Sequence, residues 1–333
     1  MKKNPSKKSP TIVGKKKPGF WVFTSVVLFL TALVFLPSLW NGSTNFDDPQ
    51  YVFENPDVHK HNIKAFWTEA YVGTYLPLTM MTYGVEYQLA GDNPQLYHFT
   101  NLFLHLINTL LVCLLMHFLI GRIEFVVIVG LLFGIHPQHV ESVAWIAERK
   151  DVLYAMFFLA SAICYVVFVK KGEEKRFYFA ALLLFLLSIL SKAQAVVLPV
   201  VLVLFDFLLG KKWLSKRMLL NKLPFFLLAL AGGAWAIYIQ KSSGAVQDFE
   251  YFEVWQRVLF AFYNCMNYIG RIFVPVHLSA FYPYPETDAE INTYWVYVAP
   301  FVVLAIAGLV FWSRKRTKAI VFGALFFLVT IAL

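Results

Sequence analysis

The sequence is built around repeated runs of about 20 apolar residues, the length that crosses the hydrocarbon core of a bilayer. Hydrophobic residues make up 59% of the 333-residue chain and charged residues only 15%, whereas soluble domains carry about 25% charged residues. Inside lipid only helices and closed barrels satisfy their backbone hydrogen bonds, and apolar runs of this length predict helices. We therefore expect an all-α polytopic integral membrane protein, a helical bundle with spans near 20–40, 98–119, 124–136, 152–169, 177–190, 195–210, 223–240, 294–313 and 317–333.

The basic residues are concentrated in a few segments, which predicts the orientation of the bundle. Residues 1–19 hold seven lysines and form a basic cytoplasmic tail that faces anionic membrane lipid. With this tail inside, 21 of the 29 Lys and Arg residues fall on the inner side, as the positive-inside rule requires. The net charge of +9 therefore reflects topology and not nucleic-acid binding.

The rest of the chain, residues 20–333, is predicted to be one membrane domain. Because the sequence reaches Leu333 inside an apolar run, we expect this domain to continue beyond it. The compact loops favour a bacterial or archaeal cytoplasmic membrane.

The acidic residues collect on the side opposite the basic ones, in segments that hold 16 of the 20 Asp and Glu. The stretch Val254–Val274 is apolar enough to span, but a span there would turn the basic residues 314–318 outward. We therefore expect a juxtamembrane helix on the outer face in the fourth outer loop, and another in the first. The predicted outer loops are 41–97, 136–151, 191–194 and 241–293.

The first outer loop opens with two adjacent carboxylates, Asp47 and Asp48, directly before Pro49. A carboxylate at a dry interface can have a raised pKa and act as a general base toward a hydroxyl. The alternative is an Asp-Pro turn in which the side chain caps a helix. The sequence leaves both interpretations open.

The second outer loop carries His136, His139 and Glu141, and then Arg149 and Asp151. Pro137 should bend the helix at the membrane edge. Two histidines and several acids raise the possibility of a metal site, but no His-Glu-X-X-His motif is present. We expect a polar substrate site or a divalent-cation site for Mg or Mn, whose ligands would come from Asp48, Glu141 and Asp151.

The remaining outer loops offer three further candidates. Lys192, alone between two apolar helices, is either a snorkelling anchor or a phosphate contact. Arg271 lies at the expected headgroup level and can pair with a lipid phosphate. Tyr282 belongs to a Tyr-Pro repeat, which either contributes to the site or forms an aromatic belt.

Three polar side chains, His98, Asn101 and His105, fall at positions i, i+3 and i+7 of an apolar helix. They form one polar stripe along that helix. Hydrogen bonding between helices is the interpretation we favour over catalysis.

The order of these motifs is more specific than any one of them. Phe46-Asp47-Asp48 and Asn55-Pro56-Asp57 are followed by Pro77-Leu78, Asn93-Pro94, the block from Tyr97 to His105, the block from His136 to Asp151, and Ser191-Lys192 with Pro199 and Asp206. From about residue 20 to about residue 290 the chain resembles the membrane part of tetratricopeptide-repeat O-mannosyltransferase-like proteins. These proteins are type C glycosyltransferases, which use lipid-linked sugars.

The resemblance implies a reaction and a set of roles. Such enzymes transfer a sugar, by default mannose, from a polyprenyl-phosphate carrier to a protein or glycan acceptor on the outer face. By this analogy Asp47 or Asp48 would activate the acceptor hydroxyl. The side chains implied to bind sugar, acceptor, cation or carrier phosphate are His136, His139, Glu141, Arg149, Asp151, Lys192, Arg271 and Tyr282.

The chain departs from the family pattern in two places. Relatives commonly have an arginine just before Pro77, where this chain has Tyr75-Leu76. Relatives also usually carry tetratricopeptide repeats after the membrane part, and residues 1–333 contain none. Two other classes stay open. A lipid-linked-sugar flippase would place its ionisable groups near the bilayer midplane, and a non-catalytic scaffold would not need these carboxylates.

Overall fold

The computed structural model describes residues 19–211, 215–244, 252–276, 278–279 and 294–332. Within these ranges the secondary structure is helical, and the one bridge, between Tyr71 and Thr74, belongs to no strand. The predicted all-α membrane class is confirmed.

Five helices in the described ranges are long and apolar enough to cross a membrane. They are α1 (Phe20–Phe35) with its 3-10 continuation to Trp40, α5 (Pro94–Leu119), α8 (Arg149–Lys170) with the turn that precedes it, α11 (Lys216–Ser242) and α14 (Tyr294–Ser313). A sixth crossing results if α6 (Ile123–Gly134) and the segment Pro137–Ala144 are one span bent by 47°. Pro137 accounts for this bend because it has no N–H to continue the helix.

The other predicted spans are shorter helices. α9 (Lys175–Ser191) ends where Ser191 meets Lys192, α10 (Leu198–Leu208) follows a 3-10 turn, and α15 (Lys318–Ile331) has 14 residues. All nine predicted spans are therefore found as helices, but five by themselves have the length and composition of a full crossing.

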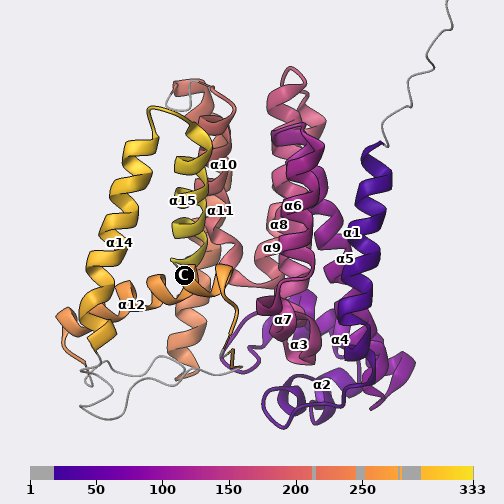
Figure 1. Cartoon of the computed structure of the whole chain (residues 1–333). Helices are drawn as coiled ribbons and strands as arrows, with labels where there is room; N and C mark the ends of the chain where they lie inside the picture. Colours follow the sequence, from indigo (N-terminus) through magenta and orange to yellow (C-terminus); the bar gives the residue numbers. More distant parts are fainter. Residues whose placement is uncertain (1–18, 212–214, 245–251, 277, 280–293, 333) are drawn as a thin grey trace, which may run out of the picture.

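The helices run alternately between two ends of the bundle (Figure 1). One end holds the start of α1, the end of α10, the start of α11 and the turns that join α5 to α6, α8 to α9 and α14 to α15, and we call it the tail end. The opposite end, which we call the loop end, holds α2 (Pro56–His59), α3 (Ile63–Thr68), α4 (Pro77–Ala90) and α7 (Val140–Ala144). The predicted inner and outer segments are thus separated between the two ends.

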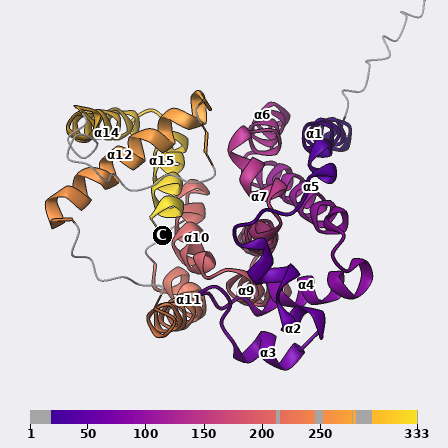
Figure 2. The same ribbon diagram turned by 90° about the horizontal axis from the view of Figure 1, so that it is seen from below.

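Helix α12 (Val254–Phe273) runs across the loop end instead of along the bundle, as Figures 1 and 2 show. It is amphipathic and packs on α14. A reciprocal capping box between Glu253 and Gln256 fixes its start, which satisfies two backbone donors that the helix leaves unpaired. The crosswise helix predicted for the fourth outer loop is therefore present, with the orientation expected of an interfacial helix.

The polar stripe on α5 ties this helix to its neighbours. Each of four buried side chains, His98, Asn101, His105 and Asn108, hydrogen-bonds to the carbonyl of another segment. The acceptors are, in the same order, the carbonyls of Gly42, Trp145, Gly134 and Val152, at 3.3, 2.9, 3.0 and 2.8 Å. The predicted interhelical role of the stripe is confirmed by these contacts.

Two glycines of α6 allow it to pack closely against α1 and α5. A methyl group added to Gly134 would lie 2.2 Å from the hydroxyl of Thr31 and 3.1 Å from Thr109, and one added to Gly130 would lie 2.6 Å from the sulfur of Cys113. Small residues at such crossings let helix backbones approach one another in membranes. The α1–α5–α6 contact therefore depends on the missing side chains.

We predict that Gly134→Ala destabilises the protein by about 1–3 kcal/mol, the usual cost of overpacking. The thermal unfolding midpoint in detergent measures the change. Gly233→Ala on α11 is the matched control, because nothing lies within 4 Å of the methyl group it adds, and it should be neutral or slightly stabilising. Equal midpoints for the two variants would contradict the packing argument.

Candidate functional site

The two carboxylates predicted to be catalytic lie in different environments at the loop end. Asp48 is completely buried. Its Oδ2 accepts hydrogen bonds from the backbone N–H of Thr44 at 2.7 Å and from the hydroxyl of Thr44 at 3.0 Å, and its Oδ1 accepts one from the N–H of Ala147 at 2.8 Å. Asp48 therefore joins the first loop to the turn before α8. Its side chain makes no hydrogen bond that caps the short helix at Pro49.

Asp47 is only half-buried, and within the described ranges no hydrogen bond reaches its carboxylate. The ring of the preceding residue, Phe46, packs against Trp145 with the centroids 5.8 Å apart. The carboxylate thus lies beside the junction between the first and second loops. Of the adjacent pair, Asp47 is the one that a substrate can reach.

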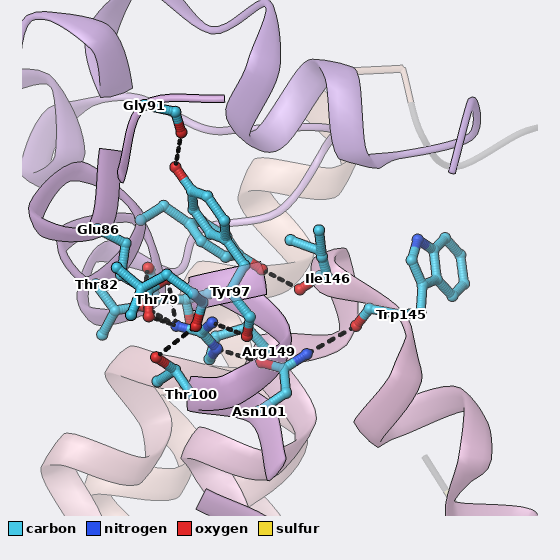
Figure 3. A network of polar contacts seen from close by, with 12 residues as sticks. Thr79, Thr82, Glu86, Gly91, Tyr97, Thr100, Asn101, Trp145, Ile146 and Arg149 are labelled. Carbon is cyan, nitrogen blue, oxygen red and sulfur yellow. Dashed lines mark hydrogen bonds and ion pairs between the residues drawn. The ribbon is translucent and has the colours of Figure 1, made fainter. Parts of the chain in front are cut away.

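Arg149 is completely buried, and its guanidinium is hydrogen-bonded along every edge (Figure 3). Nη1 contacts the two carboxylate oxygens of Glu86 at 3.0 and 2.9 Å, Nη2 donates to the carbonyl of Tyr97 at 2.8 Å, and Nε donates to the side chain of Asn101. These bonds join α4, α5 and α8. The predicted ligand contact of Arg149 is therefore corrected to a positioning role, because its donors are already used inside the protein.

Glu86 was not among the residues that the sequence singled out. It is the one charged residue between Tyr71 and Ala90, and a lone acid in such a stretch is the signal that could have found it. Burial raises the pKa of Glu86 above its ordinary value, although Arg149 and the hydroxyl of Thr100 favour its charged form. Its partner lies 63 positions away in the sequence, which no local pattern reveals.

A second group of charges lies at the start of α8. The ammonium of Lys192 binds Asp151 and lies 3.6 Å from Glu148, which in turn pairs with Lys150 at 2.9 Å. Burial alone would lower the pKa of Lys192, but the carboxylates of Asp151 and Glu148 outweigh burial and raise it above its ordinary value. Asp151 also accepts a hydrogen bond from the hydroxyl of Ser142 on α7 at 3.1 Å. This cluster therefore fixes α7 against α8.

A cavity of about 710 Å³ opens at the loop end, between α7, α12 and α15. Its charged lining residues are Glu141 of α7 and Arg271 of α12, while α15 contributes the apolar residues Phe327 and Ile331. The other lining residues are Pro137, Gln138, Val140, Tyr268, Ile272, Leu278 and Ser279. An amphipathic cavity of this kind suits a ligand with a charged head and an apolar tail.

The two predicted histidines lie near the cavity but do not line it. The Nε2 atom of His136 lies 3.1 Å from the carbonyl of Ile272 and links the start of α7 to α12. The ring of His139 packs against Phe133 and His105, with centroids 4.6 and 5.3 Å apart. Tyr282, the last predicted binding residue, lies outside the described residues.

The three proposed metal ligands do not converge. Asp48 is saturated by three hydrogen-bond donors, Asp151 is paired with Lys192, and Glu141 faces the cavity. Among the described residues no group of three His, Cys, Asp or Glu side chains could hold a metal ion. This arrangement does not fit a Mg or Mn site built from these carboxylates.

We predict that Glu86→Ala destabilises the protein by about 3–5 kcal/mol, because it leaves the buried guanidinium of Arg149 without its counter-charge. The double variant Glu86→Leu, Arg149→Met should recover much of this loss. The free energy of unfolding in a denaturing detergent is measured for the single and the double variant. Glu124→Ala, which breaks the exposed pair with Arg122, is the control and should change little. A Glu86→Ala protein as stable as this control would refute the proposed importance of the network.

The chain is similar to several known protein O-mannosyl-transferases. The chain is 29% identical to the mouse protein O-mannosyl-transferase TMTC4 over 209 residues, which cover 55% of this chain and 28% of that protein. It is 31% identical to human protein O-mannosyl-transferase TMTC3 over 169 residues (45% of this chain, 18% of that protein), and 37% identical to human protein O-mannosyl-transferase TMTC2 over 93 residues (28% and 11%).

The matched regions span less than a third of the length of these curated relatives. No family model and no solved structure matches the chain. Over about half of its length this membrane-helix bundle thus resembles the protein O-mannosyl-transferases, as its ordered motifs predicted.

Proposed function

We propose that the protein is a membrane glycosyltransferase that moves a sugar, mannose by the relatives' names, from a polyprenyl-phosphate carrier to a hydroxyl of an acceptor protein. The observation that carries the proposal is the amphipathic cavity between α7, α12 and α15. The distribution of basic residues supports an outward-facing loop end, where a carrier could enter the cavity sideways from the bilayer.

The cavity offers separate surfaces to the two parts of such a donor. Arg271 would hold the phosphate, because a guanidinium matches the oxygens of a phosphate with parallel hydrogen bonds. Phe327 and Ile331 of α15 would contact the isoprenoid chain. Glu141 would accept hydrogen bonds from sugar hydroxyls. The next residue, Ser142, donates a hydrogen bond to Asp151, which is paired with Lys192, and this contact keeps Glu141 in place.

In the proposed reaction the acceptor oxygen attacks the anomeric carbon of the sugar. The bond between that carbon and the phosphate oxygen breaks, and its electron pair leaves with the carrier phosphate. Asp47 takes the proton of the acceptor hydroxyl as general base, and Arg271 stabilises the charge of the departing phosphate. Because the carboxylates do not form a cation site, none of these steps is assigned to a metal.

The role of Asp47 can be tested by comparing three isosteric variants in liposomes, with polyprenyl-phosphate mannose as donor and a pool of Ser- and Thr-containing peptides as acceptor. We expect Asp47→Asn to lower turnover at least about 100-fold, as the loss of a general base does, without lowering the thermal midpoint. Asp48→Asn should lower the midpoint, because the amide replaces an acceptor of three hydrogen bonds with a group that itself donates. Release of the carrier phosphate and mannosylation of the peptides measure turnover.

Glu54→Gln is the control for both, since Glu54 is an exposed carboxylate of the same loop and has no proposed role. If Asp47→Asn leaves turnover unchanged, Asp47 is not the general base. Donor that crosses the liposome membrane without any transfer would instead identify a flippase.

The phosphate contact makes a separate prediction. Arg271→Gln should raise the KM for the donor about tenfold or more, the loss expected for a charged hydrogen bond, while Arg271→Lys should retain part of the affinity. Arg257→Gln is the matched control on the same helix, because Arg257 does not line the cavity. Identical KM values for the two glutamine variants would exclude Arg271 as the phosphate contact.

A further inference from the structure

Trp145 stands where the first and second loops meet. Its extended backbone, with φ −102° and ψ 125°, ends α7, and its carbonyl accepts the hydrogen bond of Asn101 at 2.9 Å. Figure 3 shows its indole ring pointing away from the Arg149 network. The backbone of Trp145 is thus fixed by the core, while its side chain extends toward the loop that carries Asp47.

The indole N–H of Trp145 is buried and, among the described residues, finds no hydrogen-bond acceptor. A buried N–H without an acceptor costs free energy, so such groups are rare and call for an explanation. Three side chains of this region, Asp48, Asn101 and Arg149, contrast with it because they are hydrogen-bonded inside the protein. The indole can only donate, so a partner must supply an oxygen that accepts.

The carboxylate of Asp47 complements the indole, since no residue that the structure describes donates a hydrogen bond to it. It follows Phe46, whose ring contacts Trp145, and the ammonium of Lys150 lies 5.9 Å from the centroid of the indole ring. Because the ammonium of Lys150 is already paired with Glu148 at 2.9 Å, the groups left to a ligand are the indole N–H as donor, the carboxylate as acceptor and two aromatic rings. A phosphate would satisfy the donor but be repelled by the carboxylate, and a metal ion would satisfy the carboxylate but not the N–H.

A sugar ring matches all of these groups, because its hydroxyls both donate and accept and its C–H face is apolar. We propose that Trp145 binds the transferred sugar, with its indole N–H donating to one hydroxyl oxygen of that sugar. This inference rests on the proposed function and adds a specificity-determining residue to it.

The test compares wild type with Trp145→Phe, which keeps an aromatic ring and removes the donor. Both are assayed with polyprenyl-phosphate mannose and with its 2-, 3-, 4- and 6-deoxy analogues. We expect wild type to use one analogue at least tenfold less well than the parent donor, the effect of one lost hydrogen bond. Trp145→Phe should lower kcat/KM for the parent donor by a similar factor. For this variant the kcat/KM values of that analogue and of the parent donor should be equal.

Trp235→Phe is the matched control, because Trp235 lies on α11, where it packs against Tyr75, and this variant should keep the wild-type pattern. Thermal midpoints are measured in parallel, and Trp145→Phe should not lower the midpoint, since it removes an unpaired buried donor. An active Trp145→Phe variant with the wild-type deoxy pattern, with or without a lower midpoint, would overturn the sugar contact and leave the proposed function standing. A wild-type protein that transfers none of these sugars would overturn both.

Discussion

The loop end depends on one buried interaction, the ion pair between Arg149 and Glu86. A guanidinium and a carboxylate removed from water lose far more solvation than their attraction alone returns, so such a pair persists only when all its donors and acceptors are bonded. Here Asn101 and the carbonyl of Tyr97 complete the set. Because Arg149 begins α8, the position of α8 relative to α4 and α5 follows from this network.

The same principle extends along α5. Carbonyls at helix ends and breaks have no partner within their own helix, and lipid supplies none. The carbonyl of Gly134 lies at the end of α6 and that of Trp145 at the end of α7, and each is bonded by a side chain of the α5 stripe. The breaks that shape the second loop are therefore stable because α5 supplies the missing donors. Those breaks bring Glu141 to the cavity and direct Trp145 toward the first loop.

The sequence predicted the features that depend on residues close together in the chain. Apolar length predicted the helices, the distribution of basic residues predicted which turns share an end, and the basic residues 314–318 predicted that α12 is a crosswise helix. It could not separate Asp47 from Asp48, because the difference comes from Ala147, 99 positions away. It assigned Arg149 to a ligand for the same reason, since the buried partner Glu86 belongs to another loop. Contacts between loops decide which polar side chain is structural.

The division between bonded and unpaired polar groups explains how a largely apolar protein can hold the groups of the proposed site in place. Asp48, Asn101 and Arg149 form their hydrogen bonds inside the protein, and these bonds fix the backbone that carries Asp47 and Trp145. Asp47 and the indole of Trp145 each lie one or a few residues from such an anchor, and neither takes part in it. A rigid set of satisfied polar groups thereby holds a small set of unsatisfied ones in place, which is the arrangement that preorganised binding of a sugar requires.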